Sequence, residues 1–205
     1  MDTEIALRPT RPAAPAPVVA SDPNLIVEAQ AGGRAALDEL AHRMRGPAYV
    51  LALQLVGNRD DALDIAQDAL LRLFQHLGRV APERPVRPWL FAIVRNRARD
   101  LWRSRAARPS ESLDARPDVV AHLAAPAGDP EQQAARRQRA RRVWTAIAEL
   151  SHAHREILVL RDFHDLAYAE IAEVLGIPAG TVMSRLHAAR GALRASLEAE
   201  GARHA

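Results

Sequence analysis

Cysteine and lysine are both absent from the 205-residue sequence. Without cysteine the chain can form neither disulfides nor thiolate metal sites, which fits a reducing compartment. All 28 basic residues are arginine, a choice that a GC-rich genome favours and to which we give little functional weight.

No apolar run approaches the ~20 residues that a membrane-spanning helix needs. The proline-interrupted N-terminus lacks the compact apolar stretch of a signal peptide. We therefore expect a cytoplasmic protein with no membrane insertion of its own.

Signatures of catalytic chemistry are missing as well. The sequence has no Ser-His-Asp order, no glycine-rich phosphate loop and no zinc-binding spacing. Asp61, Asp64 and Asp68 share one face of a predicted helix, but no histidine joins them at an offset that would complete a metal site. His152 and His154, two residues apart, cannot share a helical face and are expected at the surface. We expect no catalytic residue, no metal and no cofactor.

Helical periodicity and proline-rich interruptions define the expected architecture. After the start signal Asp22-Pro23, apolar residues recur at helical spacing through three helices, the last running from Pro88 to about Arg105. Pro47 should kink or divide the first long helix. No convincing strand is present. We expect an all-α chain of two small helical domains, in which a disordered tail is followed by a helical domain, a flexible linker and a second helical domain with a helix-turn-helix. The expected bounds are 1–22 for the tail, 23–105 for the first domain, 106–130 for the linker and 131–200 for the second domain.

Positive charge is concentrated in one segment, although the net charge is only +3. Residues 84–108 contain eight arginines and a single acid, Asp100. Arg95, Arg99 and Arg103 recur every four residues, and like charges at that spacing weaken an isolated helix. Phosphates that neutralise this ridge would explain it, and nearby aromatics suit the stacking of bases. A solvated ridge is the alternative. We favour nucleic acid for the arginines and the core for Trp89.

The stretch IAEVLGIPAGTVMSRL at 171–186 predicts two helices joined by a turn. Gly176 should end the first helix, and Thr181 is the expected N-cap of the second. Val182, Leu186 and Ala189 repeat at helical spacing and should face inward. Such a helix-turn-helix can place its second helix in a major groove of DNA. An ordinary helical hairpin is the alternative.

The helix from Asp60 has an acidic face opposite its expected apolar stripe. That stripe consists of Leu63, Ala66, Leu70, Leu73 and Leu77. Because these residues should face inward, the three aspartates should point elsewhere, together with Gln67. Either solvent or another protein could cover them.

These elements, in this order, resemble the bacterial RNA polymerase sigma factors of the extracytoplasmic-function group, in the sigma-70 family. The resemblance covers about 24–104 and 131–198. DIAQDALL at 64–71 is similar to the acidic motif of the family's region 2, with Asp68 in place of the usual Glu. PWLFAIVRNRARDL at 88–101 is similar to the stretch that melts and reads the minus-ten element, and 150–197 is similar to region 4. Ala167 stands where the family commonly has a capping Ser or Thr.

The resemblance implies a protein that binds core RNA polymerase, directs it to promoter DNA and is controlled by an anti-sigma factor in a stress or signal response. Region 2 would read minus-ten and region 4 minus-thirty-five. DNA contacts are expected from Arg84, Arg87, Arg95, Asn96, Arg99, Arg103, Thr181, Met183, Ser184, Arg185, His187 and Arg190. Polymerase contacts are expected from Asp61, Asp64, Gln67, Asp68, Leu71 and Phe74. The alternative function is an autonomous helix-turn-helix regulator that binds duplex DNA without polymerase, and a metal-dependent enzyme built on the aspartates is a third, less supported one.

Overall fold

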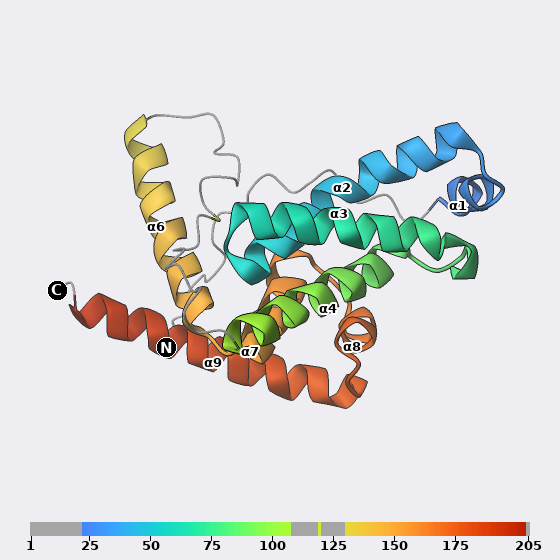
Figure 1. Cartoon of the computed structure of the whole chain (residues 1–205). Helices are drawn as coiled ribbons and strands as arrows, with labels where there is room; N and C mark the ends of the chain where they lie inside the picture. Colours follow the sequence, from blue (N-terminus) through green and yellow to red (C-terminus); the bar gives the residue numbers. More distant parts are fainter. Residues whose placement is uncertain (1–21, 108–118, 120–129, 204–205) are drawn as a thin grey trace.

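The structure, a computed structural model, describes residues 22–107, 119 and 130–203, and all regular secondary structure among them is helical (Figure 1). The all-α prediction is therefore confirmed. Most of the expected tail (1–22) and most of the expected linker (106–130) lie outside the described residues. Within the described part, no helix is both long enough and apolar enough to span a bilayer.

The helices form two groups along the chain, coloured from blue to green and from yellow to red in Figure 1. The N-terminal bundle contains α1 (Pro23–Gln30), α2 (Arg34–Val56), α3 (Arg59–Gln75), the 3-10 turn η1 (Leu77–Arg79) and α4 (Val86–Ala107). The C-terminal bundle contains α6 (Pro130–Glu149), α7 (His152–Leu158), the π-helical turn η3 (Val159–Phe163), α8 (Tyr168–Leu175) and α9 (Ala179–Arg203).

Local signals set the ends of the first helices, and the one at Asp22 acts as predicted. The Asp22 carboxylate caps α1 by accepting hydrogen bonds from the backbone N–H groups of Asn24, at 3.1 Å, and Leu25, at 3.4 Å. Gly57, at φ 77°, ends α2 in the left-handed conformation that glycine adopts without strain. The side chain of Asn58 then caps α3. These caps satisfy backbone groups that a helix end would otherwise leave unpaired.

Two prolines of this bundle, Pro47 and Pro88, lie inside helices. α2 continues through Pro47 as one helix, so of the two predicted outcomes, a kink or a division, the division does not occur. Met44 and Ala48 on either side of it are buried, and this packing holds the helix together where the proline removes a hydrogen bond. α4 begins at Val86 and not at Pro88. The third helical position suits Pro88, because an N–H in the first turn has no intrahelical partner to lose.

α3 and the turn after it bury most of the predicted stripe, since Ala66, Leu73 and Leu77 are buried, but Leu63 is not part of it. Leu63 was expected in the core but is 38% exposed. The buried residues are Ala62, Ile65, Ala66, Ala69 and Leu73. Alanines along this face let α3 lie close to α2 and α4, against which it packs. Leu63 and Leu71 lie toward solvent, whereas Leu73 stays buried. At the start of α3, close helix packing therefore selected Ala62 for the core in place of the larger Leu63.

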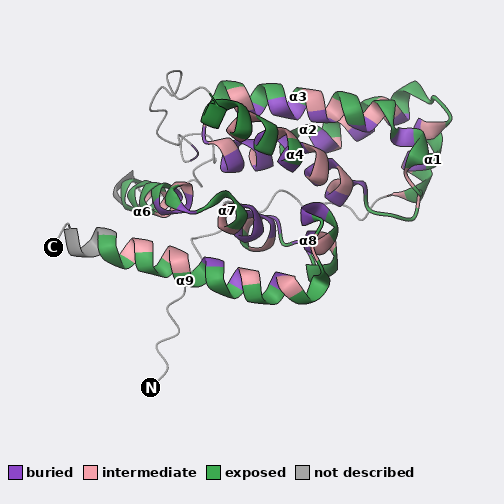
Figure 2. Ribbon diagram, turned by 60° about the horizontal axis from the view of Figure 1, so that its bottom comes forward, coloured by how far each residue is buried: buried purple, intermediate pink, exposed green. Residues whose placement is uncertain are grey.

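The two bundles pack against one another (Figure 2). α4 lies against α8, and α2 contacts α7 and η3. One contiguous cluster of buried apolar side chains includes Leu55 and Phe91 from the N-terminal bundle and Ile157 and Leu160 from the C-terminal bundle. Burial of apolar surface therefore holds the two halves of the chain together as well as each half by itself.

Polar contacts cross this interface at its buried centre. Gln54 Oε1 on α2 lies 2.7 Å from His164 Nε2, which donates the hydrogen bond when the imidazole is neutral. Arg155 on α7 donates to the Leu55 carbonyl oxygen at 2.8 Å. Arg87 on α4 donates to the His164 carbonyl oxygen. Because buried polar groups are costly when unpaired, these bonds fix the relative position of the bundles.

An aromatic stack adds to the interface near the C-terminal end of α4. The rings of Trp102 and His152 lie 3.7 Å apart between centroids and 8° from parallel. The Arg155 guanidinium lies 5.7 Å from the centroid of the Trp102 ring. Burial, together with the positive charges of Arg155 and Arg99, lowers the pKa of His152. His152 is exposed, as predicted, and its ring also joins the two bundles by stacking on Trp102.

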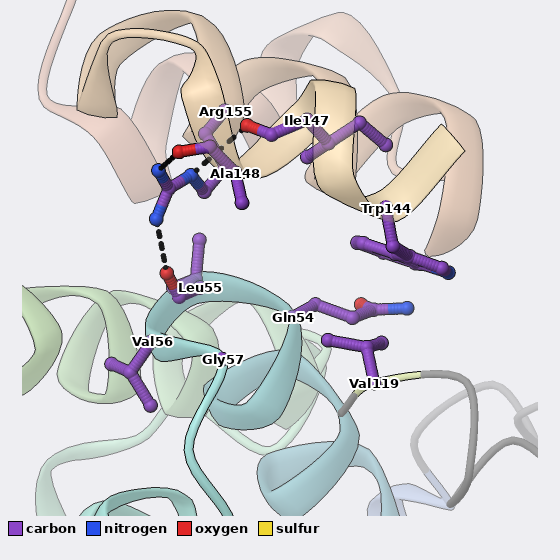
Figure 3. Close-up of a pocket in the computed structure, with 9 residues that line it drawn as sticks. All are labelled: Gln54, Leu55, Val56, Gly57, Val119, Trp144, Ile147, Ala148 and Arg155. Carbon is purple, nitrogen blue, oxygen red and sulfur yellow. Dashed lines mark hydrogen bonds between the residues drawn. The ribbon is translucent and has the colours of Figure 1, made fainter. Parts of the chain in front are cut away.

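A cavity of about 200 Å³ lies along the same interface (Figure 3). It is bordered by the end of α2 around Leu55 and Gly57, by Trp144 and Arg155 of the C-terminal bundle, and by Val119. The side chain of Val119 is 1% exposed. The packing between the bundles is therefore less complete here than in their separate cores.

His164 makes the stability of this packed arrangement dependent on pH. Burial, and to a smaller extent Arg87, lowers the pKa of His164 to about 3, whereas a solvated histidine titrates near 6.5. The unfolded chain therefore binds a proton at a pH at which the folded chain does not. Stability should be complete above about pH 6.5 and should fall by about 1.4 kcal/mol per pH unit as the pH decreases from there toward 3.

The measurement is urea unfolding between pH 7.5 and 5.5, with the pH values chosen around the titration of free histidine. The variant His164→Gln cannot titrate and should lose less stability over this interval than the wild type. His42→Gln, which removes an exposed histidine of α2, should retain the wild-type dependence. An identical pH dependence in His164→Gln and the wild type would show that His164 is not held neutral.

Candidate nucleic-acid and protein interfaces

The arginine ridge of α4 is divided between two environments. Arg99 and Arg103 have side chains that are 52% and 79% exposed. Arg103 also contacts Asp100 one turn earlier on the same helix. Arg95 is only 9% exposed and is one of the few buried charged residues in the described part of the chain. The ridge predicted from the spacing exists on the helix, but its first arginine is covered by the C-terminal bundle.

Glu156 of α7 is the residue that covers the ridge. Its Oε1 lies 3.1 Å from Arg95 Nε and 3.8 Å from Arg99 Nε. The carboxylate is 3% exposed, and burial raises the pKa of Glu156 against the opposing effect of Arg95, Arg99 and Arg185. Within the described residues, neither Arg95 Nε nor Glu156 Oε1 forms a hydrogen bond. The two atoms lie 3.1 Å apart, but the N–H of Arg95 is not aligned with the Glu156 oxygen. The ion pair therefore lacks a well-aligned hydrogen bond between these two atoms.

The other predicted residues of this segment lie along and just before α4. Asn96 is exposed, and its side-chain oxygen accepts a 3.3 Å hydrogen bond from Arg95 Nη1. Arg84 is exposed on the loop before the helix. Arg87 is half-buried, since its guanidinium binds the His164 carbonyl and lies 5.3 Å from the Phe91 ring centroid. The exposed part of this surface is therefore Arg84, Asn96, Arg99 and Arg103.

The helix-turn-helix is present as predicted, with one change at its second helix. Gly176 has φ 63° and ends α8 in the left-handed conformation. α9 begins at Ala179, so the prediction of Thr181 as N-cap is wrong. The N–H of Thr181 donates to the Pro178 carbonyl at 2.9 Å, which closes the first turn before Thr181. At the start of α8, Ala167 has no side-chain acceptor, and the Glu170 carboxylate accepts from the Ala167 N–H at 2.7 Å.

The outward face of α9 follows from its buried stripe. Val182, Leu186 and Ala189 are buried as predicted. On the opposite side the first turns present Met183, which is 64% exposed, together with Ser184 and His187. Arg185 is half-buried. Arg190 pairs with Asp162 of η3, with Nε 3.3 Å from Oδ2, so it holds α9 against η3 as well as facing solvent.

The three aspartates of α3 differ in their partners. Asp61 pairs with Arg105 at 2.6 Å, and Asp68 pairs with Arg97 at 2.7 Å. Asp68 also pairs with Arg72 one turn later, at 2.8 Å. Asp64 is exposed and has no ion-pair partner in the part of the chain that the structure describes. Of the predicted acidic surface, Asp64 alone presents an uncompensated charge, while Asp61 and Asp68 attach α3 to α4.

Apolar side chains flank Asp64 on the exposed face of α3. Leu71 is 62% exposed and Leu63 is 38% exposed. Gln67 lies between them, one helical turn from each, and Phe74 is half-buried at the end of the helix. Exposed leucines in a row around a charged residue are typical of a protein-binding surface. Leu63 was not predicted as a surface residue, because its spacing also fitted the stripe that was expected to face inward.

Comparisons with known proteins agree on one family. Family models described as "Sigma-70 region 2" and "Sigma-70, region 4" match residues 40–108 and 140–193. The chain is 32% identical over 185 residues to the RNA polymerase sigma factor CnrH of Cupriavidus metallidurans, covering 88% of this chain and 96% of that protein. It is 37% identical over 157 residues to the ECF RNA polymerase sigma factor SigL of Mycobacterium tuberculosis, covering 73% and 82%.

Solved structures of similar proteins have the same fold. The structure of CnrH in complex with the cytosolic domain of CnrY matches with a TM-score of 0.63 and 27% identity, over 87% of this chain and 98% of that one. The sigma factor RpoE of Bartonella quintana, solved with the anti-sigma factor NepR, matches with a TM-score of 0.59 over 78% and 96% of the two chains. At 23% identity this second match bears on the fold alone.

Proposed function

The chain belongs to the extracytoplasmic-function group of the sigma-70 family, and we propose that it binds core RNA polymerase in the cytoplasm and directs it to promoter DNA. As a transcription initiation factor it supplies specificity and has no catalytic role of its own. The observation that supports this best is the presence of three separate surfaces on α3, α4 and α9. One is acidic and apolar, one is rich in arginine, and one is the outward face of a helix-turn-helix.

Each surface is assigned one role in this proposal. The exposed face of α3, with Asp64, Gln67, Leu63 and Leu71, docks on the polymerase, because a negative charge is repelled by DNA phosphates. The arginines of α4, within a region 2 domain at 23–105, hold the backbone near minus-ten. α9, within a region 4 domain at 131–200, reads the minus-thirty-five element in the major groove.

An autonomous helix-turn-helix regulator is the alternative function. Such a protein would need neither the apolar-acidic face of α3 nor the arginines of α4. Run-off transcription distinguishes the sigma factor from the autonomous regulator. It uses core RNA polymerase and DNA fragments that were selected by the reconstituted holoenzyme. The sigma factor transcribes only when both proteins are present. Specific binding to duplex DNA without any association with polymerase would favour the regulator.

A regulatory partner is also part of the proposal. The solved structures of CnrH and of Bartonella quintana RpoE each contain a second protein, in the latter case named an anti-sigma factor. We propose that this chain is likewise held inactive by an anti-sigma factor until a signal releases it. Co-purification of the chain with such a protein from its own host, and its loss on induction, would support this assignment.

Reversal of one charge on α3 tests the polymerase surface. Asp64→Arg should abolish holoenzyme assembly, since it places an arginine against the basic surface that we propose Asp64 contacts. The fold should be unaffected, because an exposed substitution changes stability by only about ±0.5 kcal/mol. The measurement is a polymerase-binding assay beside a thermal melt. Asp38→Arg, at an exposed position of α2, is the matched control and should bind polymerase normally. Normal binding by folded Asp64→Arg would refute the assignment.

Removal of two exposed arginines tests the role of α4. A double variant with Arg99→Ala and Arg103→Ala should make promoter binding by the holoenzyme less dependent on salt. Its slope of log K against log salt should shrink by about 1.4 to 1.8, since each lost phosphate contact contributes about 0.7 to 0.9. Arg34→Ala with Arg45→Ala, two exposed arginines of α2, should keep the wild-type slope. An unchanged slope in the first variant would make the ridge a solvated face.

A single substitution in α9 tests base reading. Arginine is the commonest base-specific donor in the major groove, so Arg185→Ala should lower discrimination at one or two upstream positions by about 1–3 kcal/mol. The measurement compares holoenzyme affinity across single-base variants of the upstream element. Arg194→Ala, exposed on the later part of α9, should leave the preference unchanged. An equal loss on every sequence would identify Arg185 as a phosphate contact.

A further inference from the structure

Met183 is the most exposed of the large apolar side chains in the part of the chain that the structure describes. It is 64% exposed, whereas Met44 on α2 is buried in the core. The inward stripe of α9 is formed by Val182, Leu186 and Ala189 and does not include Met183. Apolar surface that stays in water adds nothing to the hydrophobic stabilisation of a fold. Met183 therefore contributes little to the packing of this chain.

The surface around Met183 is open and offers few competing polar groups. A methionine on a helix leans toward the preceding turn, so Met183 should cover Ala179 and Gly180. In the described part of the chain, a Cβ added to Gly180 would meet nothing within 4 Å beyond its neighbours in the helix. Ser184 is exposed, but its hydroxyl donates to the Thr181 carbonyl oxygen at 3.1 Å. The first turns of α9 thus present a thioether over an unobstructed stretch of helix.

We infer that Met183 reads the C5-methyl group of a thymine in the upstream promoter element. The inference rests on the proposed function, since α9 has to lie in the major groove. The thymine methyl is the one apolar group that the four bases present there, and their other exposed groups are hydrogen-bond donors or acceptors. A thioether is only a weak acceptor. It packs favourably on a methyl group, whereas a polar base edge buried against it loses its hydrogen bonds to water.

The lack of charge on Met183 separates this contact from those of the arginines. A thioether forms no ion pair with a phosphate, so its contact does not add to affinity for every sequence alike. Methionine has three rotatable bonds and can adjust to the position of the methyl group. Met183 should accordingly set a preference for thymine at one position of the upstream element. This preference should be independent of salt, because no counterion is released at a methyl group.

Deoxyuridine gives a direct test, because it lacks only the C5-methyl group of thymidine. Each thymine of the upstream element, on either strand of a fragment selected by the reconstituted holoenzyme, is replaced in turn. Holoenzyme affinity is then measured on each duplex. The wild type should lose about fourfold at one position, which is the factor for one buried methyl group. At that position Met183→Ala should bind the thymine and deoxyuridine duplexes equally well.

Two variants control for apolar character and for exposed apolar surface in general. Met183→Leu keeps an apolar side chain at the same position and should retain the loss on deoxyuridine. Val27→Ala removes an exposed apolar side chain from α1 and should retain it as well. Alanine is the best helix former, so Met183→Ala should give a normal melt by circular dichroism. At two salt concentrations the ratio of the two wild-type affinities should be the same, although both affinities change.

Equal affinity of the wild type for thymine and deoxyuridine at every position would overturn the inference. A loss that persists in folded Met183→Ala would also overturn it, because another residue would then contact the methyl group. Weaker binding of core polymerase by Met183→Ala, with an unchanged ratio on DNA, would place Met183 at a protein interface instead. Failure of the wild-type holoenzyme to form, or to select any fragment, would overturn the proposed function. That failure is distinct, since it is seen before any deoxyuridine is introduced.

Discussion

Glu156 is buried where a lone carboxylate would be costly, and Arg95 and Arg99 of α4 are what make its burial possible. This contact joins the two bundles at the charged surface that the sequence marks for nucleic acid. The contacts of Gln54 with His164 and of Arg155 with the Leu55 carbonyl have the same character. The latter two satisfy a polar group of one bundle with a hydrogen bond from the other, and the first brings opposite charges of the two bundles together. The relative position of the bundles is thus determined by polar groups, while apolar burial supplies most of the attraction.

Arginine serves two purposes in the N-terminal bundle, and the structure separates them. Arg97 and Arg105 pair with Asp68 and Asp61 and attach α3 to α4. These pairs are partly exposed, so each contributes at most about 1 kcal/mol to stability. Arg99 and Arg103 have their ion-pair partners on α7 and on α4 itself, and both keep much of their side chains in solvent. Charge density in the sequence therefore overstates the surface that is open to an anion.

Much of the fold was predictable because its signals are local. The carboxylate of Asp22, the left-handed Gly57 and Gly176, and the apolar spacing around Val182 each act within a few residues of themselves. Predictions failed where two neighbouring faces were equally plausible or where packing outweighed a local preference. On α3 the alanine face was buried in place of Leu63. In α2 the helix continues through Pro47.

The sequence by itself determined the all-α class, the helix-turn-helix, the order of the family motifs and the helix that carries each predicted contact. Only the tertiary structure decided which of those residues are free. Asp64 is open whereas Asp61 and Asp68 are paired, and Arg95 is covered whereas Arg103 is not. The physical reason is the distance along the chain over which each signal acts. Periodicity relates a side chain to its own helix axis, but an ion pair such as Arg95 with Glu156 depends on how two distant helices approach, and no local pattern encodes that distance.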